Sequence, residues 1–418
     1  MFSAENIIRE FFSQFQAFFN KQSFVLFEMI VLSLLTRYYQ DASLVQVWRW
    51  QDYSKHWTNI PRFVRCYKWE PLTLSNVLLR FLVRLFKLRE LYFVADTTLC
   101  ERYSCRLPCV FRRWILKFRR YGYAQEWVVV SIVLPRLMAR ERFRIYGLMA
   151  ALWDKTKKAT HLLEEMLLRL RLPEWCRPYL IVDAGLNSVV PEGWHIITRL
   201  RLDARLYGEP LPSRPGKRGR KPLKGKRYYA EKVFYRAKDK VILSYRNQEL
   251  KVVVRYWRVH QWGYRRALVL ICQPVAHPEW RPIVLATTDV EMSPQTLLNL
   301  YSARLEIERL FQDVKKNGAF GKYRGKKRVA HERFNNLVLL SQSLKQLIAE
   351  KGEITAIDLN EPWRKRKDAY SLSPNQLRRV LEAYHLSEKI MQLLPIQEKM
   401  QKIPFFKERI FQGLAKIL

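Results

Sequence analysis

The chain has 418 residues, of which 75 are Lys or Arg and 38 are Asp or Glu, so its formal net charge is +37 and its pI is about 10.1. Because 49% of the residues are hydrophobic and 13% are aromatic, the chain is not a disordered basic tail, and its length excludes a small disulfide-dependent scaffold. A folded protein with this charge repels itself unless a polyanion screens it, so nucleic acid is the expected partner. A basic ribosome-associated or membrane-surface protein is the alternative.

The first 88 residues have the apolar spacing of helices. Phe, Leu, Ile and Val recur every three or four residues through 7–39 and again through 72–88, with Arg and Lys between them. We therefore expect a helical DNA-binding domain over 1–88. The apolar stretch 24–35 is too short to cross a bilayer, and Glu28 interrupts it, so no membrane segment is expected.

From residue 89 the pattern changes to short apolar runs, which are typical of buried strands. Strands are expected at 91–96, 126–134, 142–149, 179–183 and 195–200, with a helix at 156–171. Strands that alternate with a helix favour an α/β fold.

Residues 203–285 break this rhythm. Residues 214–227 hold eight basic and no acidic residues among prolines and glycines, which predicts a loop or arm. Strand-like segments follow at 228–235, 240–246, 249–258 and 266–272, so we expect a β-rich insertion. The remaining sequence predicts helices at 294–317 and 331–350 and amphipathic helices over 374–418. The expected domains are 1–88, 89–202 with 286–350 as one α/β unit, the insertion 203–285, and a helical carboxy-terminal region 351–418.

Two aspartates end apolar runs in the α/β unit. Asp96 follows LYFVA and Asp183 follows YLIV. A strand end places a side chain at the edge of a sheet, where a metal or ligand can reach it. Each aspartate could alternatively be a turn or helix-cap residue, because Asp96 precedes Thr-Thr and Asp183 precedes Ala-Gly. Asp203 is a weaker rival of Asp183, since no clean apolar strand leads into it.

A third carboxylate, Glu308, lies in the expected helix 294–317. At 100° per residue, four polar side chains share an arc of about 60°: Tyr301, Arg304, Glu308 and Lys315. The apolar stripe lies beside this arc, whereas Glu306 and Asp313 lie off it and are expected to be surface charges. A carboxylate flanked by two cations and a phenol suits a site where a phosphate and a metal meet.

Three carboxylates on two strands and a helix are suited to two Mg2+ ions, for which Mn2+ can substitute. Two ions about 3.5–4 Å apart can clamp the attacking and leaving oxygens of a phosphodiester displacement. The expected catalytic and metal-binding residues are therefore Asp96, Asp183 and Glu308.

The spacing Tyr301-x2-Arg304-x3-Glu308-x6-Lys315 resembles the YREK signature of bacterial DDE transposases of the "insertion sequence four" type. Asp96-Thr-Thr and Asp183-Ala-Gly are similar to the first and second aspartate motifs of that family, and the resemblance covers roughly residues 89–330. One departure is Leu305, where many relatives carry Trp.

The resemblance implies an RNase H-like fold, with Asp96 on the first strand, Asp183 on the fourth and Glu308 on the last helix. It implies a bacterial, cytoplasmic enzyme, nucleoid-associated when bound, that cleaves at transposon ends and joins the 3′-OH to target DNA. Because two ends must be joined, a homodimer is the economical expectation. Tyr301, Arg304 and Lys315 would hold DNA-end phosphates. Relatives excise through a DNA hairpin in which a Trp of the insertion stacks on a flipped base.

Further DNA contacts are expected outside that motif. Trp280 is the preferred stacking residue, with Trp257 and Trp262 behind it, although all three could be core residues of the insertion. In the arm, Arg218-Gly-Arg220-Lys221-Pro resembles a minor-groove hook interrupted by Lys221. Five of the seven residues at 322–328 are basic, and phosphate contacts are expected from four of them: Lys322, Arg324, Lys326 and Lys327.

Two other functions fit part of this pattern. One is a catalytically silent, domesticated DNA-binding protein of transposase descent, which has no reason to keep Asp96, Asp183 and Glu308 together. The other is an RNase H-fold nuclease such as a resolvase, which has less need of a β insertion and two helical ends to hold specific DNA.

Overall fold

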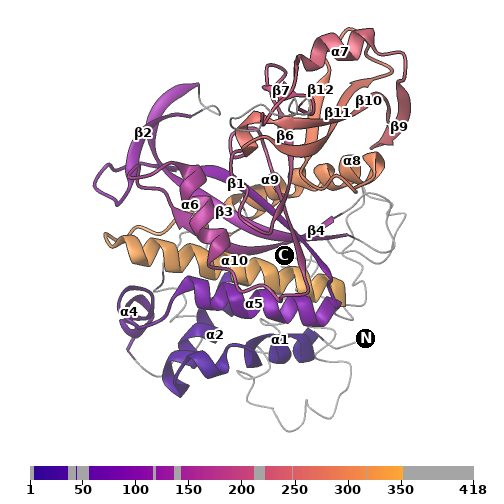
Figure 1. Ribbon diagram of the computed structural model, residues 1–418. Coiled ribbons are helices and arrows are strands. Elements are labelled where there is room, and N and C mark those ends of the chain that lie inside the picture. Colours follow the sequence, from indigo (N-terminus) through magenta and orange to yellow (C-terminus); the bar gives the residue numbers. More distant parts are fainter. Residues whose placement is uncertain are drawn as a thin grey trace, which may run out of the picture.

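One mixed sheet of 12 strands runs through the described part of the chain (Figure 1). The computed structural model describes residues 4–35, 44, 56–115, 119–135, 143–210, 222–246, 248–316 and 318–351. The strands are β1 (Glu90–Arg102), β2 (Val110–Ile115), β3 (Arg120–Pro135), β4 (Phe143–Leu152), β5 (Arg177–Val182), β6 (His195–Leu200), β7 (Leu206–Tyr207), β8 (Arg227–Tyr228), β9 (Val241–Tyr245), β10 (Gln248–Val259), β11 (Arg265–Pro274) and β12 (Ile283–Thr287).

Helices cover this sheet. They are α1 (Ala4–Ser13), α2 (Lys21–Leu35), α4 (Asn59–Arg65), α5 (Pro71–Phe86), α6 (Ala159–Leu168), α7 (Ala230–Arg236), α8 (Pro294–Ser302), α9 (Arg304–Lys316) and α10 (Arg328–Lys351), with 3-10 turns η1 (Gln16–Phe18) and η3 (His260–Trp262). The fold is therefore mixed α/β, as the sequence predicts, and none of the helices described is long and apolar enough to cross a membrane.

Strands β4, β3, β1, β5 and β6 lie side by side in that order. Strand β1 is antiparallel to β3 and parallel to β5, which is parallel to β6. Their apolar runs are buried almost throughout, because both faces of these strands are covered. The parallel arrangement brings the carboxyl ends of β5 and β6 to one edge of the sheet.

Strand β1 is longer than the sequence predicts. Asp96 was expected to end it, and this is wrong: β1 continues to Arg102, because β3 pairs with it as far as Tyr123. The parallel partner β5 stops earlier, since its last paired residue on β1 is Val94. Asp96 therefore lies two residues past Val94, the last residue of β1 that pairs with β5. At this position its side chain is at the carboxyl end of β5, where a ligand can reach it.

The strands of the expected insertion 203–285 do not form a separate sheet. Strand β12 pairs with β6 and β11 pairs with β12, so the strands of the insertion extend the sheet of the α/β unit (Figure 1). The expected strand at 228–235 is wrong, because β8 ends at Tyr228 and helix α7 follows. Ala230 and Phe234, one helical turn apart, are both buried, which explains why this segment is helical.

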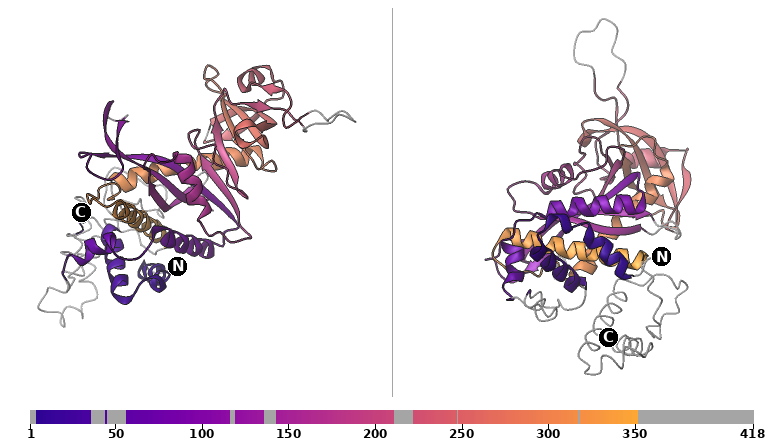
Figure 2. Two further views of the ribbon diagram at one scale, coloured as in Figure 1. Left: turned by 60° about the vertical axis from the view of Figure 1, so that its left-hand side comes forward. Right: turned by 90° about the horizontal axis from the view of Figure 1, so that it is seen from below.

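Helix α10 lies between the sheet and helices α1 and α2 (Figure 2). The side chain of Asn336 bonds both the N–H and the carbonyl of Ala150 in β4, at 2.9 and 2.8 Å, and Ser343 Oγ donates to the carbonyl of Gly147 at 2.9 Å. These bonds hold α10 along β4. Since both α2 and α1 pack on α10, this helix joins the amino-terminal helices to the sheet.

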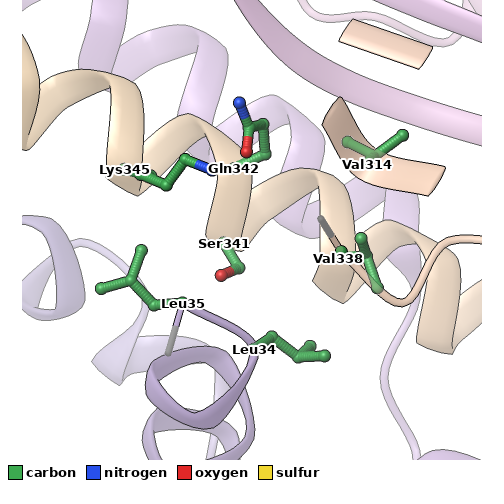
Figure 3. A pocket seen from close by; sticks show the side chains of 8 residues that line it. Leu34, Leu35, Val314, Val338, Ser341, Gln342 and Lys345 are labelled. Atoms are coloured by element: carbon green, nitrogen blue, oxygen red, sulfur yellow. The ribbon is translucent and has the colours of Figure 1, made fainter. Parts of the chain in front are cut away.

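A small cavity marks the place where α2, α9 and α10 meet (Figure 3). Leu34 and Leu35 of α2 face α10, and Val314 of α9 closes the cavity from the other side. Side chains of α2 therefore line the same cavity as α9, the helix that carries Glu308.

The expected helix 294–317 is two helices. α8 ends at Ser302 and α9 starts at Arg304, with Ala303 between them. Ser293 caps α8 by accepting a bond from the N–H of Thr296 at 3.1 Å. The expectation of one straight helix face is therefore wrong, because Tyr301 belongs to α8 and the other three polar residues belong to α9.

Candidate active site

Three carboxylates converge on one guanidinium. Arg304 Nη2 lies 3.3 Å from Oδ2 of Asp96 and 3.4 Å from Oδ2 of Asp183, and its Nη1 donates to Oε1 of Glu308 at 2.7 Å. The residues come from β1, from the loop directly after β5, and from the first turns of α9. The structure therefore brings together the three acidic residues that the sequence singles out.

The backbone explains this convergence. β1 and β5 are adjacent parallel strands, so Asp96 and Asp183 emerge at the same edge. Contacts of α9 with β1 and β4 place this helix over that edge. Asp96 is the most buried of the three, with 21% of its side chain exposed, against 42% for Asp183 and 46% for Glu308.

Burial and charge shift the pKa values in opposite directions here. Burial raises the pKa of Asp96 above its ordinary value of 3.8, although the N–H of Thr97, 2.7 Å away, and Arg304 oppose this rise. Burial lowers the pKa of the Arg304 guanidinium, but the three carboxylates outweigh it and raise that pKa overall. Arg304 thus stays charged and compensates the negative charge of the three carboxylates around it.

Lys315 and Tyr301 flank the acidic residues. Lys315 Nζ donates to the hydroxyl of Thr98 and, at 2.8 Å, to the carbonyl of Leu99, and burial lowers the pKa of this amine. Burial and the charge of Asp183 raise the pKa of Tyr301 to about 12. Tyr301 therefore lies within range of the charge of Asp183, whereas the amine of Lys315 is held beside β1, two residues after Asp96.

Arg304 has one donor left over. Its Nε–H is buried and has no hydrogen-bond partner among the side chains that the structure describes. An unpaired buried donor on a guanidinium is costly, and a bidentate oxyanion such as phosphate would satisfy it. Arg304 is therefore suited to bind a phosphate oxygen at this place.

The donor set fits a divalent cation by its chemistry. Carboxylate oxygens are the ligands that Mg2+ prefers, and the point between them already holds a positive group, the guanidinium. Over the described residues, no cluster of three or more His, Cys, Asp or Glu side chains has metal-binding geometry. The carboxylates here are arranged around Arg304, and a metal would take its place.

The basic segment after α9 lies against β1. Arg324, Lys326 and Lys327 are exposed and Lys322 is half-buried. Gly321 anchors the segment, with a φ of +74°, and an added Cβ would lie 2.4 Å from Sγ of Cys100 in β1. Only glycine allows this close approach, so the position of the basic segment depends on Gly321.

Gly321→Ala is expected to lower the free energy of unfolding by about 2–3 kcal/mol, because the added methyl group meets Cys100 and the backbone lies in the left-handed region. Urea unfolding measures the change. Gly185→Ala is the matched control, since its Cβ would have no atom within 4 Å, and its effect should stay below about 0.5 kcal/mol. Equal stability of the two variants would contradict this account of the close approach.

The three tryptophans of the insertion differ sharply. Trp257 is buried and stacked on Tyr228, and Trp262 is buried with its indole N–H donating to the carbonyl of Asn187 at 2.6 Å. Trp280 is 54% exposed and stacks on His277 with ring centroids 4.2 Å apart. Trp257 and Trp262 are therefore core residues, and Trp280 alone of the three presents its ring to solvent.

Sequence reasoning missed two features of the site. The central position of Arg304 among the carboxylates was not expected, although its i,i+4 spacing from Glu308 is a signal for a helical ion pair. Glu306 was expected at the surface, but it is buried and paired with Arg309 at 2.6 Å. Arg218, Arg220 and Lys221 of the arm lie outside the described residues, as does the chain after residue 351.

A comparison with protein families covers two of the three acidic residues, Asp96 and Asp183. A family model described as DDE superfamily endonuclease matches residues 10–258, more than half of the chain. The match includes Asp96 and Asp183 and ends before Glu308. No curated protein matches the chain. The extent of the family match decides the assignment: the chain belongs to the DDE superfamily endonuclease family.

Proposed function

We propose that the protein is a cut-and-paste DDE transposase of the "insertion sequence four" type. It binds the terminal inverted repeats of an insertion sequence, cleaves the DNA at its ends and joins the 3′-OH to target DNA. Family membership indicates an enzyme that acts on DNA. The observation that carries the finer proposal is the convergence of Asp96, Asp183 and Glu308 on Arg304.

Asp96, Asp183 and Glu308 would hold the divalent ions, Mg2+ or Mn2+. When bound, these ions activate the attacking oxygen and stabilise the leaving oxygen of the phosphodiester. The order β4-β3-β1-β5-β6, with β1, β5 and β6 parallel, supports an RNase H-like arrangement of this unit.

The remaining residues bind and orient the DNA end. Arg304 binds a phosphate through its free Nε–H as it leaves the carboxylates, and Lys315, held by Thr98 and Leu99, offers its third N–H to a second phosphate. Tyr301 stays protonated at neutral pH and donates its hydroxyl. The side chains of Arg324, Lys326 and Lys327 extend the phosphate contacts along β1.

Trp280 is the proposed stacking residue for a flipped base, since its ring is exposed. Binding of the repeats is assigned to the helices of residues 1–88 and to the arm with Arg218, Arg220 and Lys221. Two ends must be held together for joining, which a homodimer supplies. These assignments rest on the resemblance and on charge.

The test is incubation of the purified chain with end-labelled element-terminus DNA, a supercoiled target plasmid and Mg2+, followed by denaturing gels. Cleavage at the terminus and a labelled product joined to the plasmid are both expected. Cleavage without joining would favour a nuclease, and binding without cleavage would favour a silent DNA-binding protein. EDTA is the control and should abolish both products.

A further inference from the structure

A hairpin of β2 and the first half of β3 extends from the sheet (Figure 1). Strand β3 pairs with β4 along its second half, but its first half, from Arg120 to Gln125, pairs with β2 instead. No strand was expected at 110–115, because basic and aromatic residues alternate there without an apolar core face. The strand nevertheless forms and carries exposed aromatic side chains.

Four side chains share one face of this hairpin, and we call them the hairpin ladder: Arg112, Trp114, Tyr121 and Tyr123. Arg112 is paired across the strands with Tyr123, and Trp114 with Tyr121, and paired residues face the same side of a sheet. The rings of Trp114 and Tyr121 are 5.2 Å apart, and the guanidinium of Arg112 lies 5.3 Å from the Tyr121 ring. The exposed fractions of Trp114, Tyr121 and Tyr123 are 48%, 61% and 45%.

The hairpin ladder faces the same side of the sheet as Asp96. Tyr123 is paired with Arg102 of β1, and alternate residues of a strand share a face, so Thr98 and Asp96 point to the same side. Helix α9 packs on this face at Thr98, where Lys315 donates to the Thr98 hydroxyl. The hairpin ladder lies further along the same face, past the residues that α9 covers. Arg102 lies six positions after Asp96 on β1, a span of about 20 Å.

The base of the hairpin is fixed. Arg102 Nε donates to Oε1 of Gln125 at 2.9 Å, and Gln125 Nε2 donates to the carbonyl of Pro108 at 2.7 Å. His331 of α10 lies 3.4 Å from Arg102 and donates its Nε2–H to the carbonyl of Gly325, and burial lowers its pKa to about 4. The hairpin is thus bound to the carboxylate-bearing unit at a set angle, so the ladder is held in place before DNA binds.

The charge around the ladder is positive. The nearby acids are already paired, Glu101 with Arg120 at 3.4 Å and Glu126 with Arg113 at 2.6 Å. Arg112 remains exposed beside the rings. Exposed aromatic rings interleaved with arginines on a sheet surface provide base stacking and phosphate attraction together, which is the pattern of single-strand binding.

We propose that the hairpin ladder binds unpaired DNA bases next to the cleavage site. The assignment rests on the proposed function, since it takes the scissile phosphate to lie at Asp96. A span of about 20 Å corresponds to about six nucleotides of stacked strand, at 3.4 Å per nucleotide. Bases bound at Tyr123 therefore lie about six nucleotides from the cut, and bases bound at Trp114 and Tyr121 lie about two nucleotides further. The rings stack on the bases and Arg112 contacts the phosphates between them.

The test measures DNA affinity by fluorescence anisotropy in EDTA, with the full-length chain. The probes are a blunt duplex and the same duplex with a 3′ or 5′ single-stranded tail of about ten nucleotides, within the site size of single-strand modules. The wild type should prefer one of the tailed probes to the blunt duplex. Trp114→Ala should weaken binding to that tailed probe about tenfold and leave the blunt duplex within about twofold.

Matched variants separate stacking from charge and from folding. Trp175→Ala removes a tryptophan that is 61% exposed just before β5, at the opposite end of that strand from Asp183, and it should change neither affinity. Trp114→Phe should restore most of the lost affinity, since it keeps a ring. Arg112→Ala should lower the slope of log affinity against log salt by about one, whereas Trp114→Ala should leave this slope unchanged.

Three results would overturn the proposal. The first is an equal loss of affinity for tailed and blunt DNA with Trp114→Ala, and the second is no loss of affinity for either. The third is unchanged DNA binding together with a shift of the sedimentation coefficient, which would make the ladder a contact between copies of the chain. Because the measurement needs neither metal nor cleavage, it remains decisive if catalysis fails. Asp96→Asn should keep the preference for tailed DNA.

Discussion

Asp96→Asn is expected to abolish Mg2+-dependent cleavage of terminus DNA, lowering the single-turnover rate by about a thousandfold or more. The amide keeps the shape of the side chain but removes the charge nearest the core of the site, where 21% of Asp96 is exposed. Denaturing gels of end-labelled DNA measure the rate. Asp203→Asn is the control, because Asp203 is exposed and, among the described residues, forms an ion pair with Arg201 alone, so this variant should cleave normally.

The same variant should be as stable as the wild type or more so at neutral pH. Burial raises the pKa of Asp96 above 3.8, so the folded wild type loses stability as pH rises through that raised pKa. Asn carries no charge, so the gain of Asp96→Asn should be present near pH 7 and vanish below about pH 4. Thermal melts across this range check it. Normal cleavage by Asp96→Asn would refute the catalytic assignment, and a loss of stability at pH 7 would refute the account of the raised pKa.

Arg304→Ala is expected to have two linked effects. It should slow cleavage about a hundredfold or more, since the guanidinium no longer binds phosphate. It should also lower the free energy of unfolding by about 2 kcal/mol in EDTA, because three carboxylates lose their shared cation. Single-turnover rates and urea unfolding measure the two effects.

Added Mg2+ distinguishes this account from simple loss of a packing residue. A cation that replaces the guanidinium should restore stability, so Mg2+ should raise the melting temperature of Arg304→Ala more than that of the wild type. Arg201→Ala is the control, because 78% of its side chain is exposed and it has one carboxylate partner in the part of the chain that the structure describes; its stability should change by less than about 0.5 kcal/mol. An identical Mg2+ response of wild type and Arg304→Ala would contradict a shared cation position.

The core of the sheet was predictable because its signal is continuous apolar burial. The expected strand 195–200 coincides with β6, and 126–134 lies within β3. The place of Asp183 at the end of a strand was predictable for the same reason, because it directly follows a buried run that pairs with β1 on one side and β6 on the other.

The features that the sequence did not predict mostly depend on contacts between residues far apart in the chain. The extension of β1 to Arg102 requires β3, and its residues show no apolar periodicity of their own. The break between α8 and α9 is a local change of backbone hydrogen bonding, in which the N–H of Ala303 bonds the carbonyl of Leu300. The spacing of apolar residues does not reveal such a change. The central place of Arg304 needs a strand, a loop and a helix to meet, so spacing along one helix could only suggest one of its three partners.

The pairing of β12 with β6 has a consequence for any attempt to trim this molecule. Removing the predicted insertion 203–285 would take β11 and most of β12 with it, and β6 would become an open edge. Such an edge, with Ile196 and Ile197 buried in the intact sheet, is a template for intermolecular strand pairing. A minimal catalytic fragment made by that deletion should therefore aggregate, because the inserted segment protects the edge of the sheet that holds the carboxylates.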